Sequence, residues 1–304
     1  MSPLHFHLFG KFRVERNARP IKGVDAGKEQ ELLSYLLIYR ERQHPRETLA
    51  SLLWGETSTE RSKKYLRQAL WHLQTSLRSE NDKRSDVLLI EHDWIQLNSN
   101  FWLDVAEFED AFASAEGVPG HRLESKIAGA MQKVVRLYQG DLLAGCYQDW
   151  CLYERERLQN MYLSMLDKLV EYCKEHRDYE RAKRYGSTIL QYDRARERTH
   201  RRLMEVHYLA GDRTAAFRQY QRCVAALDEE LGVGPERRTV SLYEQICADQ
   251  EIGRESSQSA GRSAVEPVRE VLGRLRKLHV LLTAVQRRVQ RDIRAVEGMK
   301  LDKR

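Results

Sequence analysis

Eight side chains between positions 61 and 75 could bind a polyanion. On a helix, which advances by about 100° per residue, five of them centre on one face and three flank it. Arg and Lys can contact phosphates or guanine edges, Gln can hydrogen-bond adenine, and an aromatic ring can contact a thymine methyl group, all within a major groove that admits one helix. The central five are Arg61, Lys64, Gln68, Trp71 and Thr75, and the flanking three are Lys63, Arg67 and His72.

The opposite face of the same segment is apolar and consists of Leu66, Ala69, Leu70, Leu73 and Leu77. This pattern predicts an amphipathic helix over residues 59–78, capped by Ser58 or Thr59. Its apolar face would pack on a core, and its polar face would be free to read DNA. A solvated helix face without any ligand has the same composition, so the interpretation depends on the elements around it.

The neighbouring segments predict a winged helix. Alternation of apolar and polar residues predicts an N-terminal antiparallel sheet, which is followed by three segments with helical spacing and by two apolar strand runs around a polar turn. The second helix begins with proline, which is favoured in a first helical turn. This order is typical of the winged helix-turn-helix found on bacterial response regulators. The strands are expected at 4–9 and 12–15, the helices at 27–39, 45–54 and 59–78, and the hairpin at 87–97.

Three further residues could assist DNA binding. Arg46, at the start of the second helix, is placed to meet a phosphate together with the helix N-terminus. His92 or Trp94 could bring the hairpin near the minor groove or the backbone, although both could simply close the hairpin. The polar segment between the second and third helices can contact RNA polymerase in this fold, and it comprises Glu56, Thr57, Ser58 and Thr59.

The chain beyond residue 101 has helical spacing and contains an internal repeat. A displacement by 34 residues superposes Leu169 on Leu203, Asp178 on Asp212, Ala182 on Ala216, Arg184 on Arg218 and Leu190 on Val224. Each copy has the pattern helix, short turn, helix, and 34 residues is the tetratricopeptide period. The characteristic tryptophan is missing, so a generic array of helical hairpins stays open as an alternative. The pattern predicts an all-α repeat domain.

The C-terminal part of the chain divides into two segments. Residues 254–267 are rich in Ser, Gly and Ala and are interpreted as a linker. Residues 268–297 are predicted to form a heptad helix, which either pairs as a short coiled coil in a homodimer or docks on the repeat domain. Its candidate oligomerisation residues are Val271, Leu275, Leu278, Leu282, Val285 and Val289.

Charge is distributed unevenly around a net value of +6. Residues 1–102 carry 16 Lys and Arg against 13 Asp and Glu, and residues 254–304 carry 13 against 6, whereas residues 103–253 carry 22 against 26. Basic segments are expected of a protein that binds phosphates, although they also occur on proteins that never meet nucleic acid.

Several classes of protein are disfavoured. No apolar stretch is long enough for a membrane helix, and the N-terminus lacks the features of a signal peptide, so we expect a cytoplasmic protein without membrane contact. The five cysteines form no C-x-x-C pair, which argues against a metal site or a disulfide framework. Residues 23–28 are one residue short of a phosphate loop, and no hydrolase or dinucleotide motif occurs. We therefore expect no cofactor, no metal and no enzymatic activity.

Five segments resemble those of a known family. Residues 24–37, 46–54 and 65–74 look like the DNA-binding half of the antibiotic-regulatory activators, the SARP family. Residues 138–150, with the E-R-E-R-L run at 154–158, are similar to the signature of the bacterial transcriptional activator domain, BTAD. The resemblance implies a winged helix that binds direct repeats near a promoter, a tetratricopeptide-like domain that supports dimerisation and activation, and contact with RNA polymerase. Gln74 departs from the Leu-Arg that relatives usually carry at 73–74.

These observations predict a mainly α protein with a winged helix at 1–100, an activator domain at 101–253, a linker at 254–267 and a heptad helix at 268–297. The leading hypothesis is a sequence-specific DNA-binding activator that recognises repeated half-sites, with double-stranded DNA, RNA polymerase and a second copy of the chain as partners. The alternative is an adaptor or ligand sensor in which the repeat domain holds a partner in a concave groove and the winged helix is a scaffold.

Overall fold

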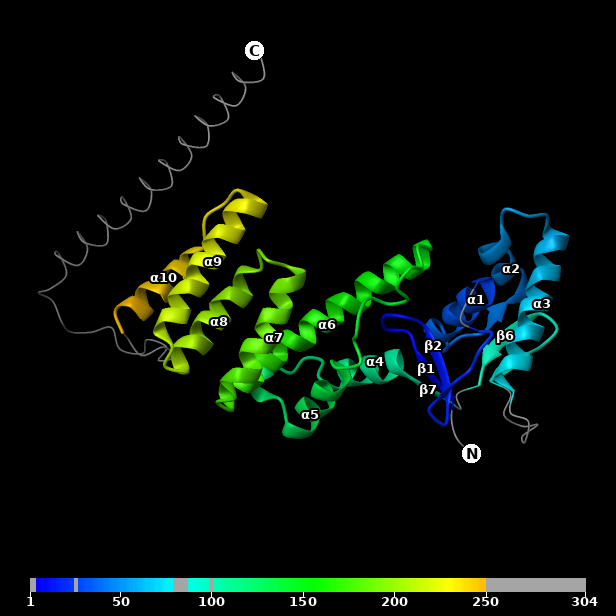
Figure 1. Cartoon of the computed structure of the whole chain (residues 1–304), viewed down its shortest axis with the longest axis horizontal. Helices are drawn as coiled ribbons and strands as arrows, with labels where there is room; N and C mark the ends of the chain where they lie inside the picture. The colour runs from blue at the N-terminus through cyan, green and yellow to red at the C-terminus, as the bar shows by residue number, and fades with distance from the viewer. Residues whose placement is uncertain (1–3, 25–26, 79–86, 99–100, 250–304) are drawn as a thin grey trace, which may run out of the picture. The chain divides into compact units, whose positions relative to one another are not determined.

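The computed structural model describes residues 4–24, 27–78, 87–98 and 101–249, which belong to one compact unit (Figure 1). The predicted linker at 254–267 and the heptad residues from Val271 to Val289 lie outside the described residues. The fold is mainly helical, with a small N-terminal sheet region. No described helix combines the length and apolar character that a membrane span requires.

The N-terminal sheet has the strand order β3-β2-β1-β7. Its outer strands are β3 (Arg19–Pro20) and β7 (Phe101–Leu103), and its inner strands are β1 (Leu4–His7) and β2 (Arg13–Arg16). Leu4 and Phe6 of β1 are buried and alternate with half-buried residues, which is the period expected of a sheet with one covered face, and Val14 of β2 is buried beside them. The strands β1 and β2 are antiparallel, as predicted.

Strand β7 corrects the expectation that the chain after residue 101 is entirely helical. It pairs in parallel with β1, with Leu4 opposite Phe101. A parallel partner must come from a distant part of the chain, and three residues are too few to show a period of two. The ring of Trp102 lies 5.2 Å from that of His5 and 5.1 Å from that of His7, so the new strand also packs across the sheet.

The winged helix is present as predicted. Its helices are α1 (Gly27–Ile38), α2 (Arg46–Trp54) and α3 (Thr59–Leu77), and its hairpin consists of β5 (Leu88–Ile90) and β6 (Trp94–Leu97). A third strand, β4 (His44–Pro45), joins the hairpin, with Pro45 opposite Trp94. Pro45 therefore precedes the helix, as the N-cap residue with an extended backbone, and does not occupy its first turn. The sequence pattern did not show this because proline suits both positions.

The helical part consists of seven α-helices and one 3-10 turn within the described residues. They are α4 (Asp104–Ser114), η1 (Gly120–Arg122), α5 (Ser125–Val134), α6 (Asp149–Glu175), α7 (Tyr179–Tyr192), α8 (Glu197–Leu209), α9 (Arg213–Leu231) and α10 (Arg237–Cys247). The pairs α6 and α7 and α8 and α9 form hairpins, each closed by a three-residue turn (Figure 1).

The 34-residue period reappears in the hydrogen bonds of these two turns. Asp178 accepts from the Arg181 amide at 3.2 Å, and Asp212 accepts from the Ala215 amide at 2.9 Å. These side chains cap α7 and α9, the second helices of the two hairpins. Ala182 and Ala216, one turn further on, are both fully buried where the paired helices approach each other. The predicted tetratricopeptide-like arrangement is confirmed.

Asp104 fastens the first helix of this array to the sheet. Its carboxylate accepts hydrogen bonds from the amides of Leu8 at 2.8 Å, Phe9 at 3.0 Å and Val105 at 2.8 Å. Its exposed fraction is 1%. The three bonds satisfy amides at the end of β1 and at the start of α4, so this buried charge holds the two halves of the compact unit together.

Candidate nucleic-acid interface

Helix α3 is built on a buried apolar face. All five predicted inner residues, Leu66, Ala69, Leu70, Leu73 and Leu77, are buried. They are spaced at three and four residues, so they form one stripe that packs on α1 and α2. This packing fixes the rotation of the helix about its axis, and it turns the opposite face outward.

The opposite face is exposed at all eight predicted positions. Trp71, a large aromatic residue, exposes 62% of its surface. The hydroxyl of Thr75 donates to the main-chain oxygen of Trp71 at 2.8 Å, which leaves its own lone pairs available as acceptors. The Trp71 and His72 rings lie 5.0 Å apart. The structure thus brings together every residue predicted on this helix.

The cations on this face are not equivalent. The Lys63 ammonium forms an ion pair with Glu47 of α2, Nζ to Oε1 2.6 Å. Arg61, Lys64 and Arg67 form no side-chain hydrogen bond or ion pair with any residue that the structure describes. Within the described ranges, three of the four positive charges are therefore unpaired and can meet an anion, and the fourth is partly neutralised.

Arg46 makes contacts that the sequence did not predict. Its guanidinium donates to the main-chain oxygen of Glu91 at 3.2 Å, and its amide donates to that of Asp93 at 2.9 Å. The residue is half-buried. Both bonds reach the turn of the β5–β6 hairpin, so Arg46 anchors the hairpin to the start of α2. The distance of 45 positions in sequence hid this contact.

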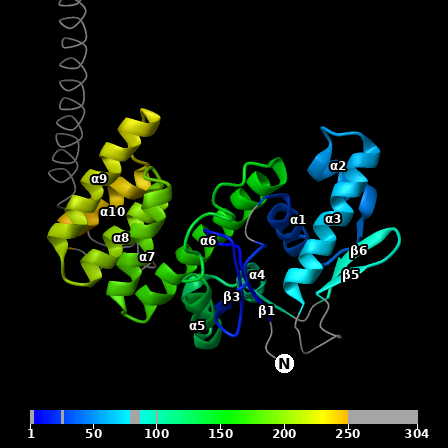
Figure 2. The same ribbon diagram turned by 45° about the vertical axis from the view of Figure 1, so that its right-hand side comes forward.

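The β5–β6 hairpin lies beside α3 (Figure 2), and it carries the other two predicted residues. His92 is almost fully exposed, and its Nδ1 lies 2.7 Å from Oδ1 of Asp93. Trp94 retains 42% of its surface exposed although its strand pairs on both sides. An exposed histidine and an exposed tryptophan on this paired hairpin are able to contact the backbone or a groove of DNA.

The segment between α2 and α3 is exposed at Glu56, Thr57, Ser58 and Thr59. The amide and the hydroxyl of Thr57 both donate to the Trp54 oxygen, at 3.0 and 2.9 Å. Ser58 is the N-cap residue of α3, but its side chain makes no capping hydrogen bond, and Thr59 is the first helical residue. The hydrogen bonds of Thr57 therefore hold the loop. The side chains of Glu56, Ser58 and Thr59 make no hydrogen bond or ion pair with any described residue.

Comparison with known proteins identifies the second half of the chain. Residues 103–247 match the model of the bacterial transcriptional activator domain family. They form a bacterial transcriptional activator domain. This finding confirms the predicted resemblance to SARP-type transcription regulators that carry this domain.

Two further proteins are similar to this chain. The regulatory protein AfsR of Streptomyces griseus is 24% identical over 261 residues, which are 84% of this chain and 26% of AfsR, so the chain spans about a quarter of the length of this curated relative. The structure of Mycobacterium tuberculosis EmbR in complex with a low-affinity phosphopeptide is similar with a TM-score of 0.62 and 17% identity, over 83% of this chain and 67% of EmbR. The likeness to EmbR shows the fold.

One residue that supports the interface was not predicted. Arg16 of β2 donates to the main-chain oxygens of Leu77 at 2.5 Å and of Arg78 at 3.2 Å. A cation at this end of α3 satisfies carbonyls that the helix leaves open and interacts favourably with its dipole. Arg16 is 61 positions from Leu77, and nothing in a local pattern could have linked the two. Arg16 therefore holds the C-terminus of α3, which belongs to the same compact unit as the activator domain.

Proposed function

We propose that this chain is a sequence-specific DNA-binding transcription regulator that inserts α3 into the major groove and activates transcription. The observation that carries the proposal is the single exposed face of α3, on which Lys64, Arg67 and Gln68 stand without partners among the described residues while the opposite face is buried. Arg reads guanine edges and Gln reads adenine, so this face can supply both affinity and sequence preference.

The remaining parts of the chain each have a role in this proposal. Residues 1–100 form the DNA-binding domain and residues 101–253 the activator domain, with a linker at 254–267 and a dimerising heptad helix at 268–297. A dimer would bind two half-sites near a promoter, and the exposed loop from Glu56 to Thr59 would contact RNA polymerase. The regulator acts in the cytoplasm and has no enzymatic role. Membership of the activator domain in a family of transcription regulators supports this assignment.

Arg46 has a supporting position in this proposal. Its guanidinium holds the hairpin turn, so it sets where His92 and Trp94 stand relative to α2. Arg46 orders the β5–β6 hairpin, and its remaining N–H groups can still meet a phosphate at the start of α2. Lys63 contributes less than its neighbours because Glu47 already neutralises part of its charge.

The test is a selection of genomic duplex fragments by the purified protein at near-physiological salt. We expect enrichment of a motif with two spaced half-sites. The variant Lys64→Ala/Arg67→Ala should lose most of this binding and should lower the dependence of log affinity on log salt by about 0.9 for each phosphate contact removed. The matched control is Arg218→Ala/Arg222→Ala, which removes two exposed charges from α9. Normal binding by the α3 variant would refute the assignment of the recognition helix.

A further inference from the structure

A polar groove of about 500 Å³ lies in the activator domain. Helices α6, α8 and α10 contribute its lining, which consists of five cationic and two acidic residues: Lys174, Arg198, Arg201, Arg202, Arg238, Glu171 and Glu205. The groove is remote in sequence from α3, and a ligand-binding role for it is independent of the proposed binding of DNA.

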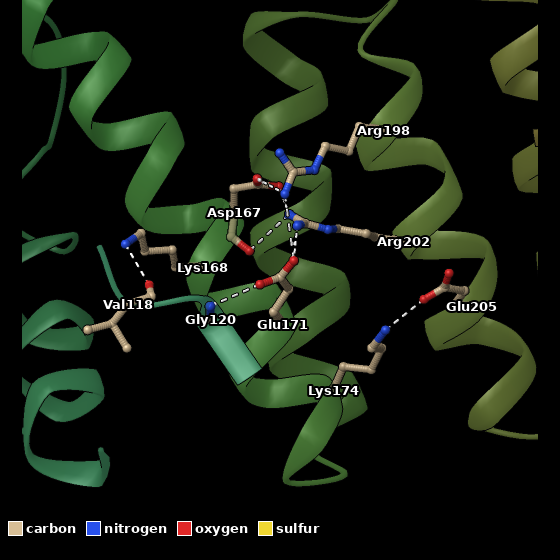
Figure 3. Close-up of polar contacts among 9 residues, drawn as sticks. All are labelled: Val118, Gly120, Asp167, Lys168, Glu171, Lys174, Arg198, Arg202 and Glu205. Atoms are coloured by element: carbon tan, nitrogen blue, oxygen red, sulfur yellow. Dashed lines mark hydrogen bonds and ion pairs between the residues drawn. The ribbon is translucent and has the colours of Figure 1, made fainter. Parts of the chain in front are cut away.

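The floor of the groove is fixed by paired charges. Arg202 of α8 donates to the carboxylates of Asp167 and Glu171 on α6 (Figure 3). The other oxygen of Glu171 accepts from the amide of Gly120 at 3.0 Å. Arg202 and Asp167 each expose 10% of the side chain. The charge of Arg202 is therefore used within the protein, and this residue positions the groove without being free to bind a ligand.

Two more cations are largely satisfied. Lys174 of α6 forms an ion pair with Glu205 of α8 at 2.7 Å (Figure 3). Arg201 donates to Glu236 at 3.1 Å and to the hydroxyl of Thr239 at 3.0 Å. These contacts join neighbouring helices. The wall of the groove therefore consists partly of ion pairs, in which each positive side chain has a negative partner.

Arg198 and Arg238 differ from these three. Arg198 exposes 60% of its side chain and reaches Asp167 and Glu171 only at 3.7 Å, beyond hydrogen-bond distance, and both carboxylates already accept from Arg202. Arg238 is exposed, and its side chain makes no hydrogen bond or ion pair with any residue in the described ranges. Two guanidinium groups with unused donors thus line one groove from adjacent helices.

The guanidinium fork matches a carboxylate in two-pronged geometry, so two such groups favour a ligand with at least two acidic groups. A groove of this volume accommodates a short peptide segment, and helical repeats commonly use such surfaces to bind extended partners. Duplex DNA fits less well because a continuous row of phosphates would lie against Glu171 and Glu205. We propose that this groove binds an acidic segment of a partner protein, with Arg198 and Arg238 as its carboxylate receptors.

The C-terminal tail of this chain is a poor occupant of the groove. Residues 254–304 carry 13 basic and 6 acidic residues, so the charge of the tail has the same sign as that of Arg198 and Arg238. The complementary partner is another protein that presents glutamate or aspartate at short intervals.

The experiment measures the fluorescence anisotropy of two labelled dodecapeptides with the full-length protein, one alternating Ser and Glu and the other alternating Ser and Lys. We expect the acidic peptide to bind and the basic one not to bind. Arg198→Ala/Arg238→Ala should weaken binding by about tenfold or more, since hydrogen bonds between charged groups are among the strongest. Arg198→Lys/Arg238→Lys should weaken it less, because the charge remains although the fork is lost. Arg218→Ala/Arg222→Ala, on α9 and outside the groove, should bind like the unaltered protein.

Thermal unfolding of each variant checks that the helical array is intact, and binding of genomic duplexes should be unchanged in Arg198→Ala/Arg238→Ala. Failure of the acidic peptide to bind, equal binding of both peptides, or equal losses in the two alanine variants would overturn the proposal. Displacement of the acidic peptide by a non-operator duplex would also overturn it, because the groove would then be a nucleic-acid site.

Discussion

The ammonium of Lys63 lies 2.6 Å from the carboxylate of Glu47, and this ion pair joins α3 to α2 on the face proposed to read DNA. Lys63→Ala should therefore weaken DNA binding less than Lys64→Ala, whose ammonium has no partner among the described residues. Glu47→Ala should strengthen binding, because it frees Lys63 and removes a negative charge near the phosphates. Titrations of the selected duplex at several salt concentrations compare the three variants. Equal losses for the two lysines would contradict this ranking.

Gly120 lies where η1 meets α6, and it tolerates no larger residue. An added Cβ would overlap the main-chain oxygen of Lys168 and the Cβ of Glu171. Gly120→Ala should lower the free energy of unfolding by about 1–3 kcal/mol, because backbone cannot move aside as a side chain can. The control is Gly129→Ala in α5, where an added Cβ meets nothing within 4 Å. That variant should be neutral or more stable by up to about 1 kcal/mol. Urea unfolding measures both, and similar effects at the two glycines would rule out the steric explanation.

Asp104 gives stability a specific dependence on pH. Burial raises its pKa to about 6, against the lowering effect of the three amides that donate to it. The folded protein therefore holds this proton more tightly than the unfolded chain, where the pKa is 3.8. The resulting stabilisation is complete below the unfolded value and is lost as pH rises through about 6.

The measurement compares the unaltered protein with Asp104→Asn by urea unfolding near pH 5 and pH 7.5. The free energy of unfolding of the unaltered protein, minus that of Asp104→Asn, should be larger at the lower pH. The buried histidines His44 and His200 have lowered pKa values and act in the opposite direction, but they are common to both proteins and cancel. A difference that stays constant with pH would show that Asp104 does not titrate in this range.

A substitution of Glu56 tests the proposed polymerase contact separately from DNA binding. It is exposed in the α2–α3 loop, whereas the loop is held by Thr57. Glu56→Ala should keep its affinity for the duplex and lose part of its activation, because it removes a side chain proposed to meet RNA polymerase. Transcription from the selected promoter with purified components measures the effect. Unchanged activation would exclude Glu56 from the polymerase contact.

Deletion of residues 254–304 tests the heptad helix. Without Leu275, Leu278 and Leu282, the proposed seam is absent, and the protein should become monomeric. Light scattering gives the mass in solution, and fragment selection shows whether two half-sites are still required. A truncated protein that remains a dimer would move the dimer interface to the described part of the chain.

The sequence was most informative where structure depends on near neighbours. The two faces of α3 follow from spacings of three and four residues, and the equivalence of Asp178 and Asp212 follows from a fixed displacement along the chain. The contacts that escaped prediction join distant positions: β7 pairs with β1, Arg16 reaches Leu77, and Arg46 reaches Glu91.

The same limit applies within the interface. Exposure of all eight residues on α3 could be deduced from the helical period, but the neutralisation of Lys63 could not, because Glu47 is on another helix. The break between α7 and α8 was also missed. Residues 193–196 contain neither glycine nor proline, so no local signal marks the end of α7 there.

Strand β7 ends at Leu103, and α4 begins at the next residue, Asp104, which is bonded back to Leu8 and Phe9. A chimeric regulator joins the DNA-reading half of one protein to the activator half of another. Residue 100 is therefore a poor position for the junction. Such a graft would set β1 of one protein against the edge strand and the anchoring carboxylate of another, and a mismatch between them would leave this edge of the sheet poorly paired and prone to aggregation. A donor segment that extends through α4 would carry its own edge strand and its own anchoring carboxylate, and operator preference could then be exchanged as an intact module.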